Sequence, residues 1–274
     1  MPVINTNVNA LFAQNAMKVN SRSLSSAMEQ LSTGSRINSA KDDAAGLAIS
    51  SSMTSQIRGL NQAVRNANDG ISMLQTAEGA MVEQSNMLQR MRELGVQASS
   101  DTLDADQKGY LKTEFDALAT QIDSIATQTK WNGMNVLTGV GGPGGNGQFN
   151  VTVTANGSDA ITLEPGDTTT ATLQVDALDI TTAPADAVTK IDDALKTLNG
   201  YRANIGANIN RLTYASDNLS NVIQNTTASR SQIQDTDYAT VTTQLARSQI
   251  ISQAATAMLA QANQSQQSVL ALLK

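Results

Sequence analysis

The C-terminal segment 241–273 repeats small and apolar residues with a spacing that suits a helix packed lengthwise on a partner. The repeat advances by four and three residues in turn, which is the heptad step of a coiled coil. Its members are Val241, Leu245, Ser248, Ser252, Ala255, Leu259, Ala262, Gln266, Val269 and Leu273. The stripe is wider than a two-helix seam because it also includes Ile250, Ile251, Ala254 and Met258. Since isolated helices are marginally stable in water, we expect this segment to be buried by another surface.

The N-terminal segment 1–40 has the same character. Its apolar residues step by four and three positions over 4–11 and again, after a phase shift, over 24–31. We expect both terminal segments to pack on each other and on copies from other subunits; two ordinary frayed terminal helices are the alternative. The candidate polymerisation residues are Ile4, Val8, Leu11, Leu24, Met28, Leu31, Leu245, Ile251, Met258, Leu259, Val269 and Leu273.

The chain contains neither cysteine nor histidine. These absences exclude a disulfide framework, Ser-His-Asp or Cys-His catalysis, and the usual transition-metal ligand sets. We therefore expect no enzyme activity and no catalytic, cofactor or metal site. A formal net charge of −6 argues against nucleic-acid binding. No apolar run approaches the roughly 18 residues of a membrane span, and the N-terminus lacks the basic and apolar regions of a signal peptide.

Three long stretches between the termini carry helical periodicity: 47–99, 105–129 and a third that begins near Pro184. The first would span roughly 80 Å as a helix, at about 1.5 Å per residue. Three glycines inside it either permit close packing or weaken the helix, namely Gly59, Gly70 and Gly79. The predicted fold class is mainly α, a long antiparallel helical rod or bundle with terminal coiled-coil helices.

Local signals mark two helix starts. The stretch Asp104-Ala-Asp-Gln107 has the form of a capping box. It also resembles a calcium loop, but Lys108 and Phe115 occupy ligand positions and disfavour that interpretation. The adjacent Asp42 and Asp43 are assigned to the N-terminal turn of the helix that follows, because neighbouring carboxylates point apart on a helix and favour its positive end.

Residues 131–182 change to a β-rich pattern. Alternating residues from Phe149 to Leu163, with a turn at Asn156-Gly157, predict a β-hairpin, and Leu173 and Val175 suggest a third short strand. The glycine-rich run 139–144 matches G-x-G-x-x-G, but without a strand-turn-helix context it is interpreted as a flexible turn. The predicted domains are a terminal one, 1–40 with 236–274, and a helical one, 41–235, which contains the small β region.

Six motifs follow one another along the chain: LSTGSRINSAKDDAAGLAIS (31–50), RNANDGISMLQTAEGA (65–80), LQRMRELGVQ (88–97), WNGMNVL (131–137), SRSQIQDTDYATVTTQLARSQI (229–250) and AQANQSQQSVLALL (260–273). With these motifs the chain resembles bacterial flagellin over nearly its whole length. The resemblance implies a secreted subunit that self-polymerises into the extracellular flagellar filament for swimming motility, with the terminal helices as a coiled-coil inner tube. With only 131–182 between the helical halves, this would be a short form without a large outer variable domain.

The resemblance also implies partners. These are other copies of the chain, the flagellar type III export apparatus, a chaperone on the C-terminal segment, the filament cap and the hook-filament junction proteins. Many relatives are ligands of the flagellin-sensing Toll-like receptor, and four residues match its epitope: Gln89, Arg90, Leu94 and Glu114.

Other functions remain as alternatives. The nearest is a hook-filament junction protein, which shares the terminal architecture without forming long filaments. A surface adhesin or innate-immune ligand would be a secondary role. An inserted metalloprotease needs H-E-x-x-H and therefore histidine, a carboxylate-dependent hydrolase needs a concave pocket, and a pilin needs a long apolar N-terminal helix.

Overall fold

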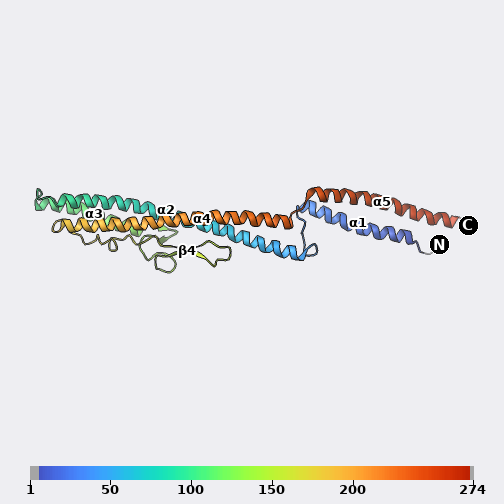
Figure 1. The fold of residues 1–274 in the computed structure, drawn as a ribbon, viewed down its shortest axis with the longest axis horizontal. Coiled ribbons are helices and arrows are strands. Elements are labelled where there is room, and N and C mark those ends of the chain that lie inside the picture. The colour runs from blue at the N-terminus through green and yellow to red at the C-terminus, as the bar shows by residue number, and fades with distance from the viewer. Residues whose placement is uncertain (1–5, 272–274) are drawn as a thin grey trace. The chain divides into compact units, whose positions relative to one another are not determined.

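The structure is a computed structural model that describes the backbone of residues 6–271 and side chains through residue 264. Its elements, in order, are α1 (Val8–Thr33), α2 (Ala44–Ala98), α3 (Ala105–Gln128), β1 (Lys130–Trp131), β2 (Met134–Asn135), β3 (Phe149–Thr152), β4 (Ala160–Leu163), α4 (Pro184–Gln234) and α5 (Tyr238–Ala271) (Figure 1). The chain forms two compact units, 1–55 with 225–274, and 56–224. The mainly α fold class is confirmed. The assignment of 1–40 and 236–274 to an inner-tube domain stays a prediction.

Short polar residues define the helix ends, as several sequence signals predicted. The capping box at Asp104 is present, with its carboxylate accepting from the Gln107 amide and the Gln107 side chain accepting from the Asp104 amide. Asp43 accepts from the Gly46 amide at 2.9 Å in the first turn of α2. Asp42 instead accepts from the hydroxyl and amide of Ser39, in the loop before α2. Gly34 ends α1 in the left-handed conformation, at φ 69°, which glycine adopts without strain.

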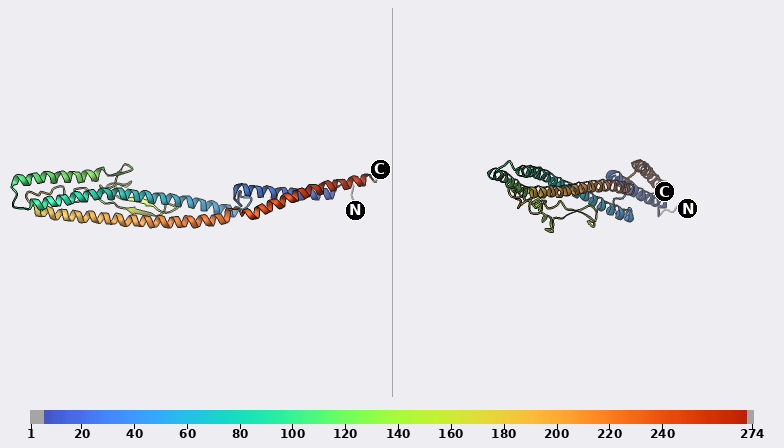
Figure 2. Two further views of the ribbon diagram at one scale, coloured as in Figure 1. Left: turned by 90° about the horizontal axis from the view of Figure 1, so that it is seen from above. Right: turned by 60° about the vertical axis from the view of Figure 1, so that its left-hand side comes forward.

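The unit 56–224 has a core shared by three helices. Arg90 pairs with Glu114, and Gln84 donates to the Ile122 carbonyl, so α3 runs antiparallel to α2 (Figure 2). Contacts of Gly70 with Leu212 and of Gly95 with Val188 show that α4 is antiparallel to α2 as well. The largest fully buried side chains of these helices are Leu74, Met81, Leu88, Met91, Leu94, Phe115, Ile122, Ile191 and Leu198.

The β region consists of two small hairpins. The predicted hairpin is confirmed, with Phe149 opposite Leu163 and Thr152 opposite Ala160. A second hairpin, β1–β2, was not predicted. Its turn residues Asn132 and Gly133 have φ of 49° and 79°, the left-handed pair that suits a two-residue hairpin loop.

The predicted third strand at 173–175 is wrong. This stretch folds into tight turns, in which the Leu173 amide donates to the Thr169 carbonyl and the Val175 amide to the Thr170 carbonyl. Leu173 and Val175 are 3% and 1% exposed. Both side chains therefore reach the core from turns, and a spacing of two residues does not distinguish that arrangement from a strand.

The glycines inside α2 have different environments, so the same substitution should have opposite effects. A Cβ on Gly59 would lie 2.6 Å from the Ala155 carbonyl oxygen, whereas one on Gly79 would meet nothing within 4 Å. We expect Gly79→Ala to stabilise the protein by about 1 kcal/mol through helix propensity, and Gly59→Ala to destabilise it by about 1–3 kcal/mol through overpacking. Urea denaturation measures both, and equal effects of the two variants would contradict this account.

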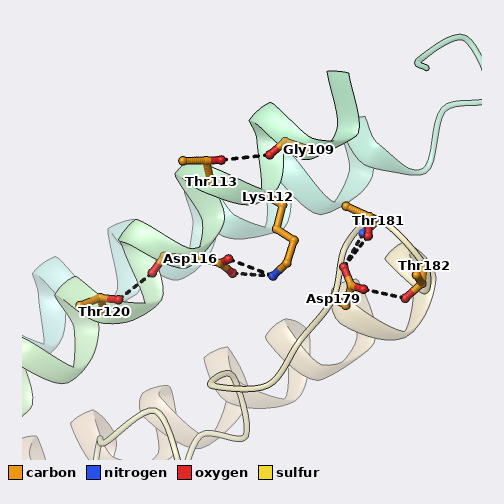
Figure 3. Close-up of polar contacts among 8 residues, drawn as sticks. All are labelled: Gly109, Lys112, Thr113, Asp116, Thr120, Asp179, Thr181 and Thr182. Atoms are coloured by element: carbon orange, nitrogen blue, oxygen red, sulfur yellow. Dashed lines mark hydrogen bonds and ion pairs between the residues drawn. The ribbon is translucent and has the colours of Figure 1, made fainter. Parts of the chain in front are cut away.

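The loop before α4 is organised by one carboxylate. Asp179 accepts from the amide and hydroxyl of Thr181, at 3.0 and 2.7 Å, and from the Thr182 hydroxyl at 2.9 Å (Figure 3). These hydrogen bonds, with a smaller attraction from Lys112, lower the pKa of Asp179 to about 2. Lys112 itself pairs with Asp116 at 2.9 Å along α3. The ionised Asp179 carboxylate thus stabilises the loop conformation through these hydrogen bonds.

The lowered pKa predicts how the loop responds to acid. Because the folded-state pKa lies below the unfolded value, the contribution of Asp179 to stability is fully present above about pH 4 and is lost as the pH falls towards 2. Thr181→Val removes the hydroxyl donor and should raise the pKa of Asp179 towards its ordinary value. A carboxyl NMR titration of both proteins tests this, and an unchanged midpoint would show that the hydroxyl has no such role.

Candidate functional site

Helices α1 and α5 pack along each other through a continuous heptad seam. On α5 the positions that are shielded from solvent are Val241, Leu245, Ser248, Ser252, Ala255, Leu259 and Ala262, which is the predicted repeat as far as side chains are described. On α1 the shielded heptad positions are Ala10, Ala13, Met17, Asn20, Leu24, Ala27 and Leu31, and Ser23 and Gln30 beside them are half-buried as well. These steps of three and four residues form one stripe on each helix. Small residues occupy three of the seven positions on α1 and four of the seven on α5.

Two asparagines tie α1 to the backbone of α5. Asn20, which is 8% exposed, donates its side-chain amide to the Ser248 carbonyl at 2.7 Å. Asn7 caps α1 by accepting from the Ala10 amide and donates to the Ala262 carbonyl at 3.1 Å. As the residue number rises along α1 it falls along α5, so the pair is antiparallel. The buried Asn20 amide is satisfied, which removes most of the cost of burying it.

The connection at one end of the pair is closed by backbone hydrogen bonds. Ser35 and Asp235 form an antiparallel bridge. The Arg36 amide donates to the Gln234 carbonyl at 2.6 Å, and the Thr236 amide donates to the Gly34 carbonyl at 3.0 Å. The loop after α1 and the loop before α5 are therefore joined, and this junction fixes where the seam begins.

Only some of the predicted polymerisation residues lie on the seam between α1 and α5. Leu24, Leu31, Leu245 and Leu259 lie on it. The other members with described side chains are exposed: Val8, Leu11, Met28, Ile251 and Met258. Ile4 and Leu273 lie outside the described residues, and the side chain of Val269 does as well. The stripe thus divides into residues that join α1 to α5 and residues that remain available on the surface of the pair.

An apolar groove runs along one side of the α1–α5 pair and has a volume of about 670 Å³. We call it the terminal groove; its lining residues are Asn9, Phe12, Ala13, Ala16, Ile251, Ala254, Ala255, Met258, Gln261 and Ala262. Five of these are alanines, whose short side chains leave a depression between the larger side chains. Phe12 and Met258 are 80% and 66% exposed. Sequence reasoning missed Phe12, because it is out of phase with the stripe that was read from Val8 and Leu11.

The described residues offer little for chemistry. They hold no cluster of three or more acidic, histidine or cysteine side chains that could bind a metal ion. None of the helices, within the same residues, is long and apolar enough to cross a membrane. What is distinctive in this unit is the apolar surface of the helix pair.

Comparison with known proteins gives the family. Residues 4–141 match the bacterial flagellin N-terminal helical region, and residues 188–273 match the bacterial flagellin C-terminal helical region. The chain is 42% identical to the flagellin of Halalkalibacterium halodurans, over 99% of this chain and 100% of that protein. The chain belongs to the bacterial flagellin family.

Further relatives agree with this assignment. The flagellar filament 33 kDa core protein of Treponema phagedenis is 41% identical, over 99% of this chain and 100% of that protein. The crystal structure of Bacillus cereus flagellin matches with a TM-score of 0.51 and 30% identity, covering 57% of this chain and 88% of that one. This flagellin is accordingly a helical structural protein of the extracellular flagellar filament and not an enzyme. Only residues 142–187 separate the two matched regions, which is consistent with a short form.

The four residues predicted to form a receptor epitope lie near one another in unit 56–224 but differ in exposure. Arg90 Nε lies 2.9 Å from Glu114 Oε1, and Arg90 Nη1 lies 2.9 Å from Glu93 Oε2. Gln89 is exposed beside them. Leu94 is 1% exposed and belongs to the core. The structure therefore brings three of the residues to the surface, and Leu94 supports that surface from below.

Proposed function

We propose that the α1–α5 pair is the assembly element of this flagellin and that its terminal groove receives a helix from a neighbouring copy. The observation that carries the proposal is the groove itself: its lining has no charged residue, and Phe12, Ile251 and Met258 are exposed along it. Large exposed apolar patches on soluble proteins mark interaction sites. Each such side chain that becomes fully covered contributes about 1.5–3 kcal/mol.

The exposed residues on the rest of α1 supply a complementary surface. Val8 and Leu11 are 55% and 56% exposed and do not line the groove. A contact between Val8 and Leu11 of one copy and the terminal groove of the next would join two different surfaces. Such heterologous contacts do not close on themselves unless the rotation allows a ring, and they otherwise generate helical filaments. The arrangement thus supports open-ended polymerisation.

A charge placed in the groove tests the proposal. Ala254→Glu is expected to reduce filament elongation from short seeds by at least about tenfold, because a neighbour would bury an unpaired carboxylate. Ala260→Glu places the same charge on an exposed alanine of α5 outside the groove lining. It should elongate near the wild-type rate. Equal elongation by both variants would refute the groove as the interface.

Before assembly, the same apolar surface is exposed on the free subunit and can bind another protein. We propose that the chaperone of the export pathway binds the exposed face of α5 around Ile250, Ile251 and Met258, all of which are solvent-exposed. Chaperone and neighbouring copies would then exclude each other, and added chaperone should stop seeded elongation. The filament cap and the junction proteins are proposed to contact the same helix pair at the filament ends. A chain that fails to elongate from its own seeds would favour the junction-protein alternative.

A secondary role as a receptor ligand is favoured by the exposed surface around Arg90. We propose that Gln89, Arg90 and Glu114 contact the flagellin-sensing Toll-like receptor, while Leu94 supports them from the core. Arg90→Ala should lower receptor signalling by a reporter-cell assay without affecting seeded elongation. A loss of both activities would point to misfolding rather than to a receptor contact.

A further inference from the structure

Two methionines of the described chain are exposed to solvent. Met258 is 66% exposed and Met28 is 50% exposed. The other methionines with described side chains are half-buried or buried. Because thioether oxidation follows access to the oxidant, a reagent in solution would reach these two sulfurs first.

Only one of the two lies in the terminal groove. Met258 lines it together with Phe12, Ala254 and Ala255, whereas Met28 lies outside its lining. The only polar side chains of the lining are those of Asn9 and Gln261. Conversion of a thioether to a sulfoxide replaces a flexible apolar group with a polar, hydrogen-bond-accepting one. In this groove the new oxygen would lie on a mainly apolar lining.

We propose that Met258 is an oxidation site that switches off assembly of the free subunit, with peroxides as the class of oxidant. This inference rests on the proposed function, because it requires the terminal groove to be covered in the filament. It concerns the subunit before incorporation, when Met258 is accessible. Once the groove is occupied, the neighbouring helix shields the sulfur.

The reaction balances with peroxide as the only co-reactant. The Met258 sulfur attacks one peroxide oxygen, so that an S–O bond forms as the O–O bond breaks. The thioether is oxidised to a sulfoxide, and hydrogen peroxide is reduced to water after proton transfer to the departing hydroxide. A methionine sulfoxide reductase supplied with a dithiol reverses the change: the dithiol is oxidised to a disulfide, the sulfoxide returns to the thioether, and the oxygen leaves as water. The site therefore supports a reversible modification.

The experiment treats the full-length monomer with hydrogen peroxide and then measures seeded elongation, with peptide mass spectrometry to quantify each sulfoxide. Wild-type protein oxidised at Met258 should elongate about tenfold more slowly, since a polar group must then be buried in a mainly apolar groove. Met258→Leu replaces the thioether with a group of similar apolar volume, and peroxide should not lower the elongation rate of this variant below its own untreated rate. Met28→Leu removes the other exposed thioether and should be inhibited as strongly as the wild type. Reductase treatment should restore the wild-type rate.

The outcomes separate this inference from the proposed function. If Met258 is converted and elongation is unchanged, or if Met28→Leu rather than Met258→Leu protects, the inference is overturned while the groove remains the interface. Oxidation of assembled filaments supplies the second measurement. Protection of Met258 in filaments relative to monomers supports both proposals. Equal oxidation rates in the two states would show that the groove is not covered, and both would fail.

Discussion

Replacing Leu259 with aspartate is expected to abolish filament elongation and to separate α5 from α1, while residues 56–224 stay folded. Leu259 lies on the seam and not in the groove lining. The substitution removes an aliphatic contact, which costs about 2–5 kcal/mol for a fully buried leucine and less at this half-buried position. It also places a carboxylate on the seam, level with Ala10 by the register that the Asn7–Ala262 and Asn20–Ser248 hydrogen bonds set, and the seam residues include no cationic side chain to pair with it. Loss of the pair destroys the groove, which both helices line.

Two measurements distinguish this outcome from general misfolding. Hydrogen exchange should show lost protection in α1 and α5 with normal protection in the core around Leu88, and seeded elongation should fall below detection. Gln253→Asp places the same charge on an exposed position of α5 and should change the exchange pattern little. Normal filaments from Leu259→Asp would mean that the seam is dispensable.

The second large effect is expected from Phe115→Ala in the other unit. Phe115 is 1% exposed and packs in the core formed by α2, α3 and α4. Truncating a buried phenylalanine typically costs about 3–5 kcal/mol, because burial is lost and a cavity remains. We expect the urea midpoint of this unit to fall accordingly, with α3 losing protection first.

A neighbouring aromatic residue provides the control for Phe115. Tyr110 lies on the same helix and is 74% exposed, so Tyr110→Ala should change the free energy of unfolding by no more than about 0.5 kcal/mol. Below the new midpoint, Phe115→Ala should still elongate from seeds, since it does not alter α1 or α5. An equal loss of stability in both variants would contradict the proposed packing of α3.

The helices could be predicted from the sequence because periodicity and end signals agree. Over α2 and α4 the apolar spacing persists for many turns, and Asp104, Pro184 and Gly34 stand where helices begin or end. The β region was harder. The turn at Asn132-Gly133 carried a hairpin signal that its very short strands obscured. Leu173 and Val175 have the two-residue spacing of a strand, but they are buried from local turns instead.

The candidate site was predicted only in part, for a physical reason. The α5 repeat proved to be the face that packs on α1. The predicted α1 stripe followed large aliphatic residues, so it included Leu24 and Leu31, which lie on the seam, but also Val8 and Leu11, which are exposed. Three of the seven α1 seam residues are alanines and a fourth is the buried Asn20, and hydrophobicity alone does not single out these four. The partition between internal seam and external groove depends on three-dimensional pairing, which a single-helix pattern does not contain.

The seam between α1 and α5 contains no ionisable side chain, and neither does the lining of the terminal groove. The charged residues of these helices, Lys18, Arg22, Glu29 and Arg247, lie at exposed positions off the seam. Raised ionic strength therefore has no ion pair to screen between the described residues of α1 and α5. The groove lining likewise offers no charge to the proposed contact with a neighbouring copy. Strongly hydrated anions such as sulfate, which are excluded from protein surfaces and strengthen apolar burial, act on both in the same favourable direction. Salting-out should thus promote both the packing of α1 on α5 and the proposed contact between copies at the terminal groove. Cooling, which weakens apolar association, should oppose both.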